Sequence, residues 1–123
     1  MNSSTLLAKA EDALFRRVRE AGLPEPLELG VLSVADALYP SCRPYWREAG
    51  QALARLPYDI RRAVVEVIRR HPPAENYPPS RRRGEAAAWA MGAAMGYFTA
   101  RSRLLDAACR AWQAAKERGS IRV

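Results

Sequence analysis

The chain has 123 residues, a length that suits one domain with a single hydrophobic core and leaves no room for a second. Apolar residues make up 49% and charged residues 27% of it, which excludes the composition of a disordered chain. The longest uncharged run, Ala86 to Ala100, is shorter than the ~20 apolar residues that cross a bilayer, which argues against a transmembrane segment.

The net charge of +7 is unevenly distributed along the chain. Residues 1–40 have four basic and six acidic side chains, whereas residues 41–123 have sixteen basic and seven acidic ones. Arginine supplies eighteen of the twenty basic residues, a bias that GC-rich coding also produces. Because guanidinium groups suit bidentate phosphate contacts, a basic half-molecule of this kind indicates a surface for nucleic acid or for an acidic partner.

The first predicted helix covers residues 4–21, where apolar side chains recur every three or four positions. Gly22, followed by Leu23 and Pro24, predicts its end, since glycine favours the left-handed conformation just past a helix. Residues 23–30 contain two prolines and are predicted to be a connector.

A short helix is predicted over residues 33–39, because Ser33 with Asp36 three positions later resembles a capping box. Four acidic residues occur in and before this stretch with no intervening lysine or arginine: Glu20, Glu25, Glu28 and Asp36. This acidic zone is interpreted either as a solvated loop face or as a docking surface for the basic half of another copy. In the second case Glu25 and Glu28 are candidate contacts.

Two further helices are predicted over residues 45–56 and 58–71, with Pro57 between them. Helical spacing assigns these residues to their core faces: Trp46, Ala49, Leu53, Leu56, Ile60, Val64, Val67, Ile68 and His71. The other faces of the second helix carry four arginines: Arg61, Arg62, Arg69 and Arg70.

A proline-rich linker over residues 72–80 leads into one long helix, predicted over 80–118, and residues 120–123 form a short tail. An apolar seam with steps of four and three follows this helix: Met91, Met95, Phe98, Ser102, Leu105, Cys109 and Trp112. Gly92 and Gly96 lie inside the helix, where each costs about 1 kcal/mol relative to alanine. They predict a close partner helix, either from the same chain or from another copy. The sum of these elements is an all-α fold, a compact bundle of four to five helices in a single domain, 1–123.

Catalytic chemistry has little support in the sequence. The one histidine, His71, directly precedes a proline and is interpreted as a helix-terminal residue. No residues have metal-ligand spacing and no glycine motif could cradle a phosphate, so neither a metal, a cofactor nor an enzyme is predicted. Cys109 lies on the apolar seam and is expected to be a buried free thiol, which fits a cytoplasmic protein without a secretory signal.

The arginine clusters are the strongest functional pattern. Five arginines flank the proline linker, at 69–70 and 81–83, with Tyr77 between them as a candidate stacking group. An arginine in a first helical turn opposes the helix dipole by about 0.3–1 kcal/mol, unless it meets an anion. The predicted nucleic-acid contacts are Arg61, Arg62, Arg69, Arg70, Arg81, Arg82, Arg83, Arg103 and Arg110.

The leading interpretation is a non-enzymatic protein that binds the backbone of DNA or RNA without reading its sequence, inside a larger nucleoprotein complex. In its size, its arginine-rich faces (Arg61/Arg62, Arg69/Arg70 and Arg81–Arg83) and its long terminal helix, the chain resembles the small helical subunits of CRISPR effector complexes. The resemblance implies copies that stack along a guide–target duplex, with no cofactor. The alternative is an oligomeric interaction module or inhibitor whose basic face meets an acidic protein. A minor third reading is a phage or mobile-element packaging or partition protein.

Overall fold

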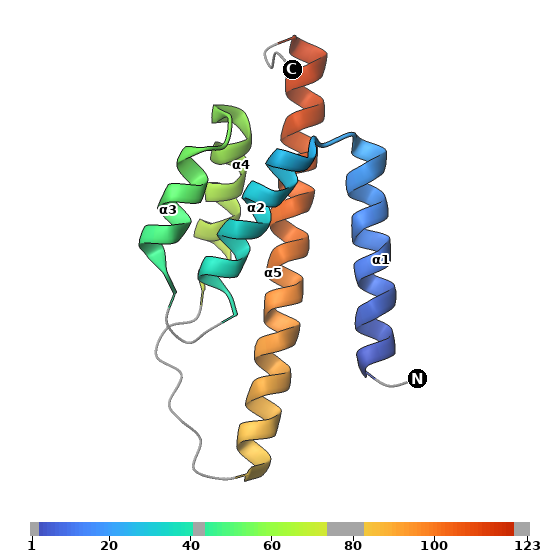
Figure 1. The fold of residues 1–123 in the computed structure, drawn as a ribbon, viewed down its shortest axis with the longest axis vertical. Helices are drawn as coiled ribbons and strands as arrows, with labels where there is room; N and C mark the ends of the chain where they lie inside the picture. The colour runs from blue at the N-terminus through green and yellow to red at the C-terminus, as the bar shows by residue number, and fades with distance from the viewer. Residues whose placement is uncertain (1–2, 41–43, 74–82, 120–123) are drawn as a thin grey trace.

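The computed structural model describes residues 3–40, 44–73 and 83–119, with the side chains of 3, 4, 7 and 83–95 outside the description. Within these ranges the chain forms helices and no strand (Figure 1). The helices are α1 (Ser3–Ala21), α2 (Glu25–Leu38), α3 (Trp46–Ala54), α4 (Tyr58–Arg70) and α5 (Arg83–Arg118). The prediction of an all-α bundle with one long C-terminal helix is confirmed. Most of the linker predicted over 72–80, and the tail at 120–123, lie outside the described residues.

Helix α5 is the axis of the bundle, and α1, α2 and α4 pack against it (Figure 1). Helices α2 and α4 contact α5 on one side, and α1 lies along its other side. Helix α3 packs mainly on α2 and forms the periphery. As a result, α1 and α4 present their outer surfaces in different directions.

Two glycines follow helix ends, and both of these ends fall where the sequence predicted them. Gly22 (φ +73°) follows α1, and its N–H donates to the carbonyl of Arg19 at 3.1 Å. Gly119 (φ +66°) follows α5, and its N–H donates to the carbonyl of Lys116 at 3.0 Å. A side chain with a Cβ is strained in this left-handed region, which is why glycine is favoured at both positions.

The connector predicted over residues 23–30 is wrong, because α2 begins at Glu25. Pro24 is its N-cap and the next proline falls in its first turn, where no backbone N–H is needed for an intrahelical bond. Ser33 therefore lies inside the helix instead of capping it, and its hydroxyl donates to the carbonyl of Leu29 at 2.9 Å. The prolines that suggested a loop start a helix.

The tightest glycine contact in the described residues is at Gly30 of α2. A Cβ built there would lie 2.9 Å from Cδ2 of Leu56, a buried side chain at the turn between α3 and α4. By contrast, a Cβ on Gly96 of α5 would have nothing within 4 Å. The interpretation of Gly96 as a close helix crossing inside the chain is therefore wrong, and the close approach occurs at Gly30.

The core lies between α5 and the three helices that contact it. Leu105, Cys109 and Trp112 of the predicted seam are buried, and so are Leu104 and Ala108 beside them, because neighbours cover α5 from two sides. The predicted seam residues Met91 and Met95 lie outside the described side chains.

Two residues assigned to the core are exposed, and both stand at helix ends. Trp46 is the first residue of the peripheral helix α3 and is 50% exposed. His71 is the C-cap of α4, with a φ of −132° that takes its side chain out of the helical register. The spacing of apolar residues does not show where an apolar face extends beyond the helix that covers it.

Candidate nucleic-acid interface

The spacing of residues along α4 places apolar side chains on one face of the helix and basic side chains on another. Ile60, Val64 and Ile68 follow steps of four and are buried against the bundle. Tyr58, Arg62, Val65 and Arg69 follow steps of four, three and four, which places them in one stripe on another side of the helix. Packing of the apolar face thus fixes the direction in which the arginines project.

The basic stripe borders an open hollow with a volume of about 340 Å³. We refer to it as the α4 hollow, and its lining residues are Tyr58, Arg61, Arg62, Val65, Glu66 and Arg69. Three of the arginines predicted to contact nucleic acid, Arg61, Arg62 and Arg69, therefore come together in one place.

The carboxylates of α4 are engaged by other arginines. Glu66 accepts a hydrogen bond from Nε of Arg70 at 3.1 Å, and Oδ2 of Asp59 lies 3.6 Å from Nη2 of Arg118 at the end of α5. Among the described residues, no carboxylate pairs with the three arginines of the α4 hollow. The hollow consequently keeps an excess of positive charge.

An exposed aromatic ring forms one wall of this basic hollow. Tyr58 is 63% exposed, and the guanidinium carbon of Arg61 lies 5.9 Å from the centre of its ring. The distance is within the range of a cation–π contact. The sequence-based candidates did not include Tyr58, although its position four residues before Arg62 was a usable signal.

Of the other predicted arginines with described side chains, Arg70, Arg103 and Arg110 do not line the α4 hollow. Arg103 and Arg110 are exposed on α5. Arg110 borders a second hollow of about 390 Å³, whose walls come from α1 and α5 and carry both charges, including Arg17, Glu20 and Asp106. Arg17 and Asp106 form an ion pair there, with Nε 3.6 Å from Oδ1. This second hollow is close to neutral and is a weaker candidate for phosphate.

Several predicted contacts cannot be placed. Arg81 and Arg82 lie outside the described residues, as does Tyr77, and the same is true of the side chain of Arg83, the first residue of α5. The surroundings of Gly92 are outside the description as well. The predictions that these residues bind nucleic acid or another copy therefore stay predictions.

The two acidic residues proposed as contacts between copies belong to the first turn of α2. Glu25 is exposed and Glu28 is half-buried. A negative charge at a helix N-terminus is favourable by about 0.3–1 kcal/mol, so both residues stabilise their own helix.

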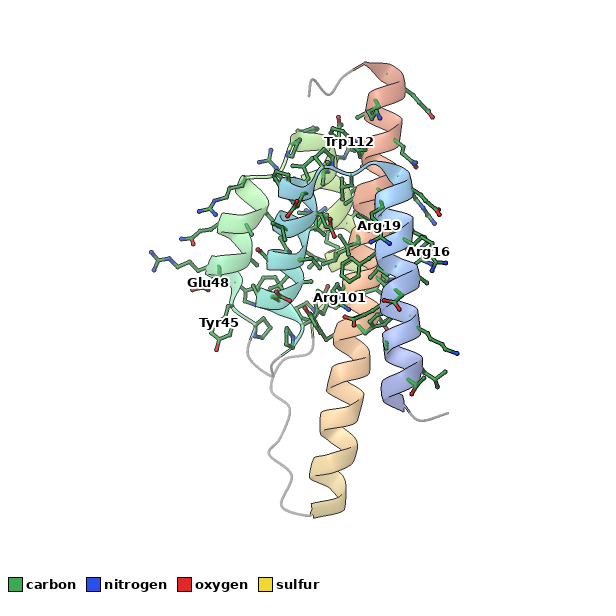
Figure 2. The ribbon with its side chains drawn as sticks, turned by 45° about the vertical axis from the view of Figure 1, so that its right-hand side comes forward. Arg16, Arg19, Tyr45, Glu48, Arg101 and Trp112 are labelled. Atoms are coloured by element: carbon green, nitrogen blue, oxygen red, sulfur yellow. The ribbon has the colours of Figure 1, made fainter. Side chains whose placement is uncertain are left out.

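Arg101 shows that not every arginine of α5 is available to a ligand. Its side chain is 12% exposed and forms an ion pair with Glu11 of α1. The rings of Tyr97 and Phe98 lie 5.4 Å from its guanidinium carbon and that of Phe15 lies 5.6 Å away. Figure 2 places Arg101 between α5 and α1. Arg101 is therefore part of the α1–α5 interface.

The same cluster also ties α2 to α5. The hydroxyl of Tyr97 donates a hydrogen bond to Oδ1 of Asp36. Burial, followed by this hydrogen bond and the charge of Asp36, raises the pKa of Tyr97 from 10.0 to about 12. Asp36, predicted as part of an acidic docking zone, thus has a partner within the chain.

The predicted free thiol at Cys109 is confirmed as buried. Burial raises its pKa, with smaller contributions from the negative charges of Asp106 and Glu28, so the thiol form is favoured. Within the described ranges, no three His, Cys, Asp or Glu side chains form a candidate metal site. In the same part of the chain, no helix is both long and apolar enough to cross a membrane.

Comparisons with protein-family models, with curated proteins and with solved structures find no match for this chain.

Proposed function

We propose that the protein binds the phosphate backbone of nucleic acids at the α4 hollow, without a catalytic step and without reading base sequence. One observation carries the proposal: Arg61, Arg62 and Arg69 line a single open hollow, and no carboxylate of the described residues pairs with them. Cations without a counter-charge among the described residues are available to an external polyanion.

The chemistry of the three side chains favours phosphate as the ligand. A guanidinium group presents paired N–H donors that match two phosphate oxygens, and it stays charged at every physiological pH. Each phosphate that is neutralised also releases condensed counterions from the nucleic acid. Such contacts position a protein on the backbone and carry no base information, which is the basis for proposing sequence independence.

A role as a small structural subunit of a larger nucleoprotein complex extends this proposal. The open space at Gly96 and the acidic first turn of α2 are candidate contacts between copies in such an assembly. Assignment of the complex to the CRISPR effector class rests on the resemblance described above and is likewise a proposal.

A charge-matched pair of variants tests the site. Arg61→Gln/Arg62→Gln/Arg69→Gln removes three charges from the α4 hollow. Lys9→Gln/Arg16→Gln/Arg19→Gln removes three from α1, where all three side chains are exposed and Figure 2 shows Arg16 on the outer side of the helix. We expect the first variant to reduce the salt dependence of single-strand binding by about 2 in log–log slope, at about 0.7 per phosphate. Equal losses in both variants would assign binding to net charge and not to the hollow.

The alternative ligand is an acidic protein, because carboxylates also form bidentate pairs with arginine. Competition separates the two. If mixed-sequence DNA and RNA fail to bind in low salt while poly-glutamate binds through the same three arginines, the interaction-module interpretation replaces the proposal.

A further inference from the structure

We infer that the ligand of the α4 hollow is single-stranded nucleic acid, and that Tyr58 stacks on one of its bases. The inference rests on the proposed function and adds the strand class and a base-contacting residue. Its first support is the position of the ring: Tyr58 is 63% exposed and borders the same hollow as the three arginines.

The surroundings of the ring fit a stacking role. The guanidinium carbon of Arg61 lies 5.9 Å from the ring centre, and the exposed fraction leaves ring surface open to a ligand. Burial in the core does not explain this side chain, since α4 packs through Ile60, Val64 and Ile68. A large apolar ring in solvent beside a cluster of cations is the combination found in single-strand binding grooves.

A stacking contact with Tyr58 favours a single-stranded ligand over a double-stranded one. A base in a duplex is already stacked on its neighbours, and a side chain that approaches from outside the helix reaches only its edge. An unpaired base exposes a flat face, and every base has one, so stacking on tyrosine is compatible with sequence-independent binding.

The test combines Tyr58→Ala and Tyr58→Phe with two ligands of equal length. One is a base-bearing single strand, used as oligo-dT and as oligo-U, and the other is an abasic phosphodiester strand. We expect Tyr58→Ala to weaken binding of both base-bearing strands by about five- to a hundredfold and to leave the abasic strand unaffected. Tyr58→Phe, which keeps the ring, is expected to bind like the unmodified protein. Tyr45→Ala is the matched control, because Tyr45 is 59% exposed at the N-terminal end of α3 (Figure 2) and does not border the hollow.

Three results would overturn the inference, and they differ in what they leave standing. Unchanged binding of Tyr58→Ala to base-bearing strands removes the stacking contact but leaves backbone binding intact. An equal loss of affinity for abasic strands shows that the Tyr58 ring acts only through Arg61. That result also rules out the stacking contact. Failure of the unmodified protein to bind any of the strands in low salt removes the proposed function itself.

Discussion

Glu66 accepts a hydrogen bond from Arg70 one turn further along α4, with Oε1 and Nε 3.1 Å apart. Glu66 is the one carboxylate among the described residues that line the α4 hollow, so it lowers the positive charge there. Arg70 itself does not line the hollow, and Glu66 holds a negative charge beside the proposed path of the backbone.

Replacing Glu66 with glutamine is therefore expected to strengthen binding. The change removes one negative charge from the hollow and releases Arg70, and we expect nucleic-acid affinity to rise about two- to tenfold in low salt, with little change in stability for an exposed i,i+4 pair. Fluorescence anisotropy with a labelled oligonucleotide measures the effect. Glu48→Gln is the control, because Glu48 projects from the outer side of α3 (Figure 2) and its loss changes the net charge equally. The same gain in both variants would contradict a local role for Glu66.

Gly30 and Gly50 are expected to respond in opposite ways to alanine. Gly50 lies inside α3 with nothing within 4 Å of a built Cβ, so Gly50→Ala should raise the free energy of unfolding by about 0.5–1 kcal/mol. At Gly30 the Cβ meets Leu56 at 2.9 Å, and we expect overpacking to cancel that gain and lower the stability by roughly 1 kcal/mol. Urea denaturation followed by circular dichroism compares them. A stabilised Gly30→Ala protein would mean that the Leu56 side chain gives way without a loss of packing, which contradicts the overpacking expected here.

The Arg101–Glu11 ion pair is expected to contribute more to stability than the more exposed Arg17–Asp106 pair. Glu11→Gln leaves a guanidinium that is 12% exposed without its carboxylate, and we expect a loss of about 1–2 kcal/mol, since Glu11 itself is partly solvated. The control Asp106→Asn breaks the ion pair between Asp106 (41% exposed) and Arg17 (55% exposed). The expected loss of unfolding free energy is about 0–1 kcal/mol. Thermal unfolding midpoints of the two variants decide the order, and a larger loss for Asp106→Asn would contradict it.

Tyr97 is expected to make stability sensitive to alkaline pH. Its pKa is raised from 10.0 to about 12 in the folded protein, so the folded state holds this proton more tightly than the unfolded chain does. The resulting stability is complete below pH 10 and is lost as the pH rises toward 12. Tyr97→Phe has no hydroxyl to ionise, and its urea midpoint should fall less steeply over this interval. Parallel pH profiles for the two proteins would rule out ionisation of Tyr97 as the cause.

Gly96→Leu tests the prediction that copies of the chain meet along the first half of α5. A Cβ at this exposed position has nothing within 4 Å, so leucine should fit the monomer without loss of stability. If copies associate there, the larger side chain should shift the sedimentation of the protein toward the monomer. Identical sedimentation of the two proteins would remove Gly96 from the interface.

The sequence was sufficient for the elements whose signals are local. The ends of α1 and α5 at Gly22 and Gly119 follow from backbone sterics, and the faces of α4 follow from its 3.6-residue period. The start of α2 was not predicted because a proline has opposite meanings inside a helix and in its first turn, and Pro24 was interpreted as a breaker.

Features that depend on neighbouring helices could not be predicted in the same way. The spacing of α5 did not reveal that Leu104 is buried, because that depends on which helices cover it. The sequence did not distinguish Arg101 from the other arginines of α5, because its burial depends on contacts with Glu11 and three aromatic rings. Arg61, Arg62 and Arg69 lie close together because they share one helix, and this was predictable from their spacing. The ion pair between Asp59 and Arg118 joins two helices far apart in sequence, so spacing could not predict it.

The most direct test of nucleic-acid binding at the α4 hollow is backbone amide chemical-shift mapping with a mixed-sequence single-stranded oligonucleotide in low salt. We predict that the largest changes fall in α4, between Tyr58 and Arg69, and that they are lost in the Arg61→Gln/Arg62→Gln/Arg69→Gln protein. Changes that are largest along α1, or no changes at saturating oligonucleotide, would contradict the claim that the α4 hollow binds nucleic acid.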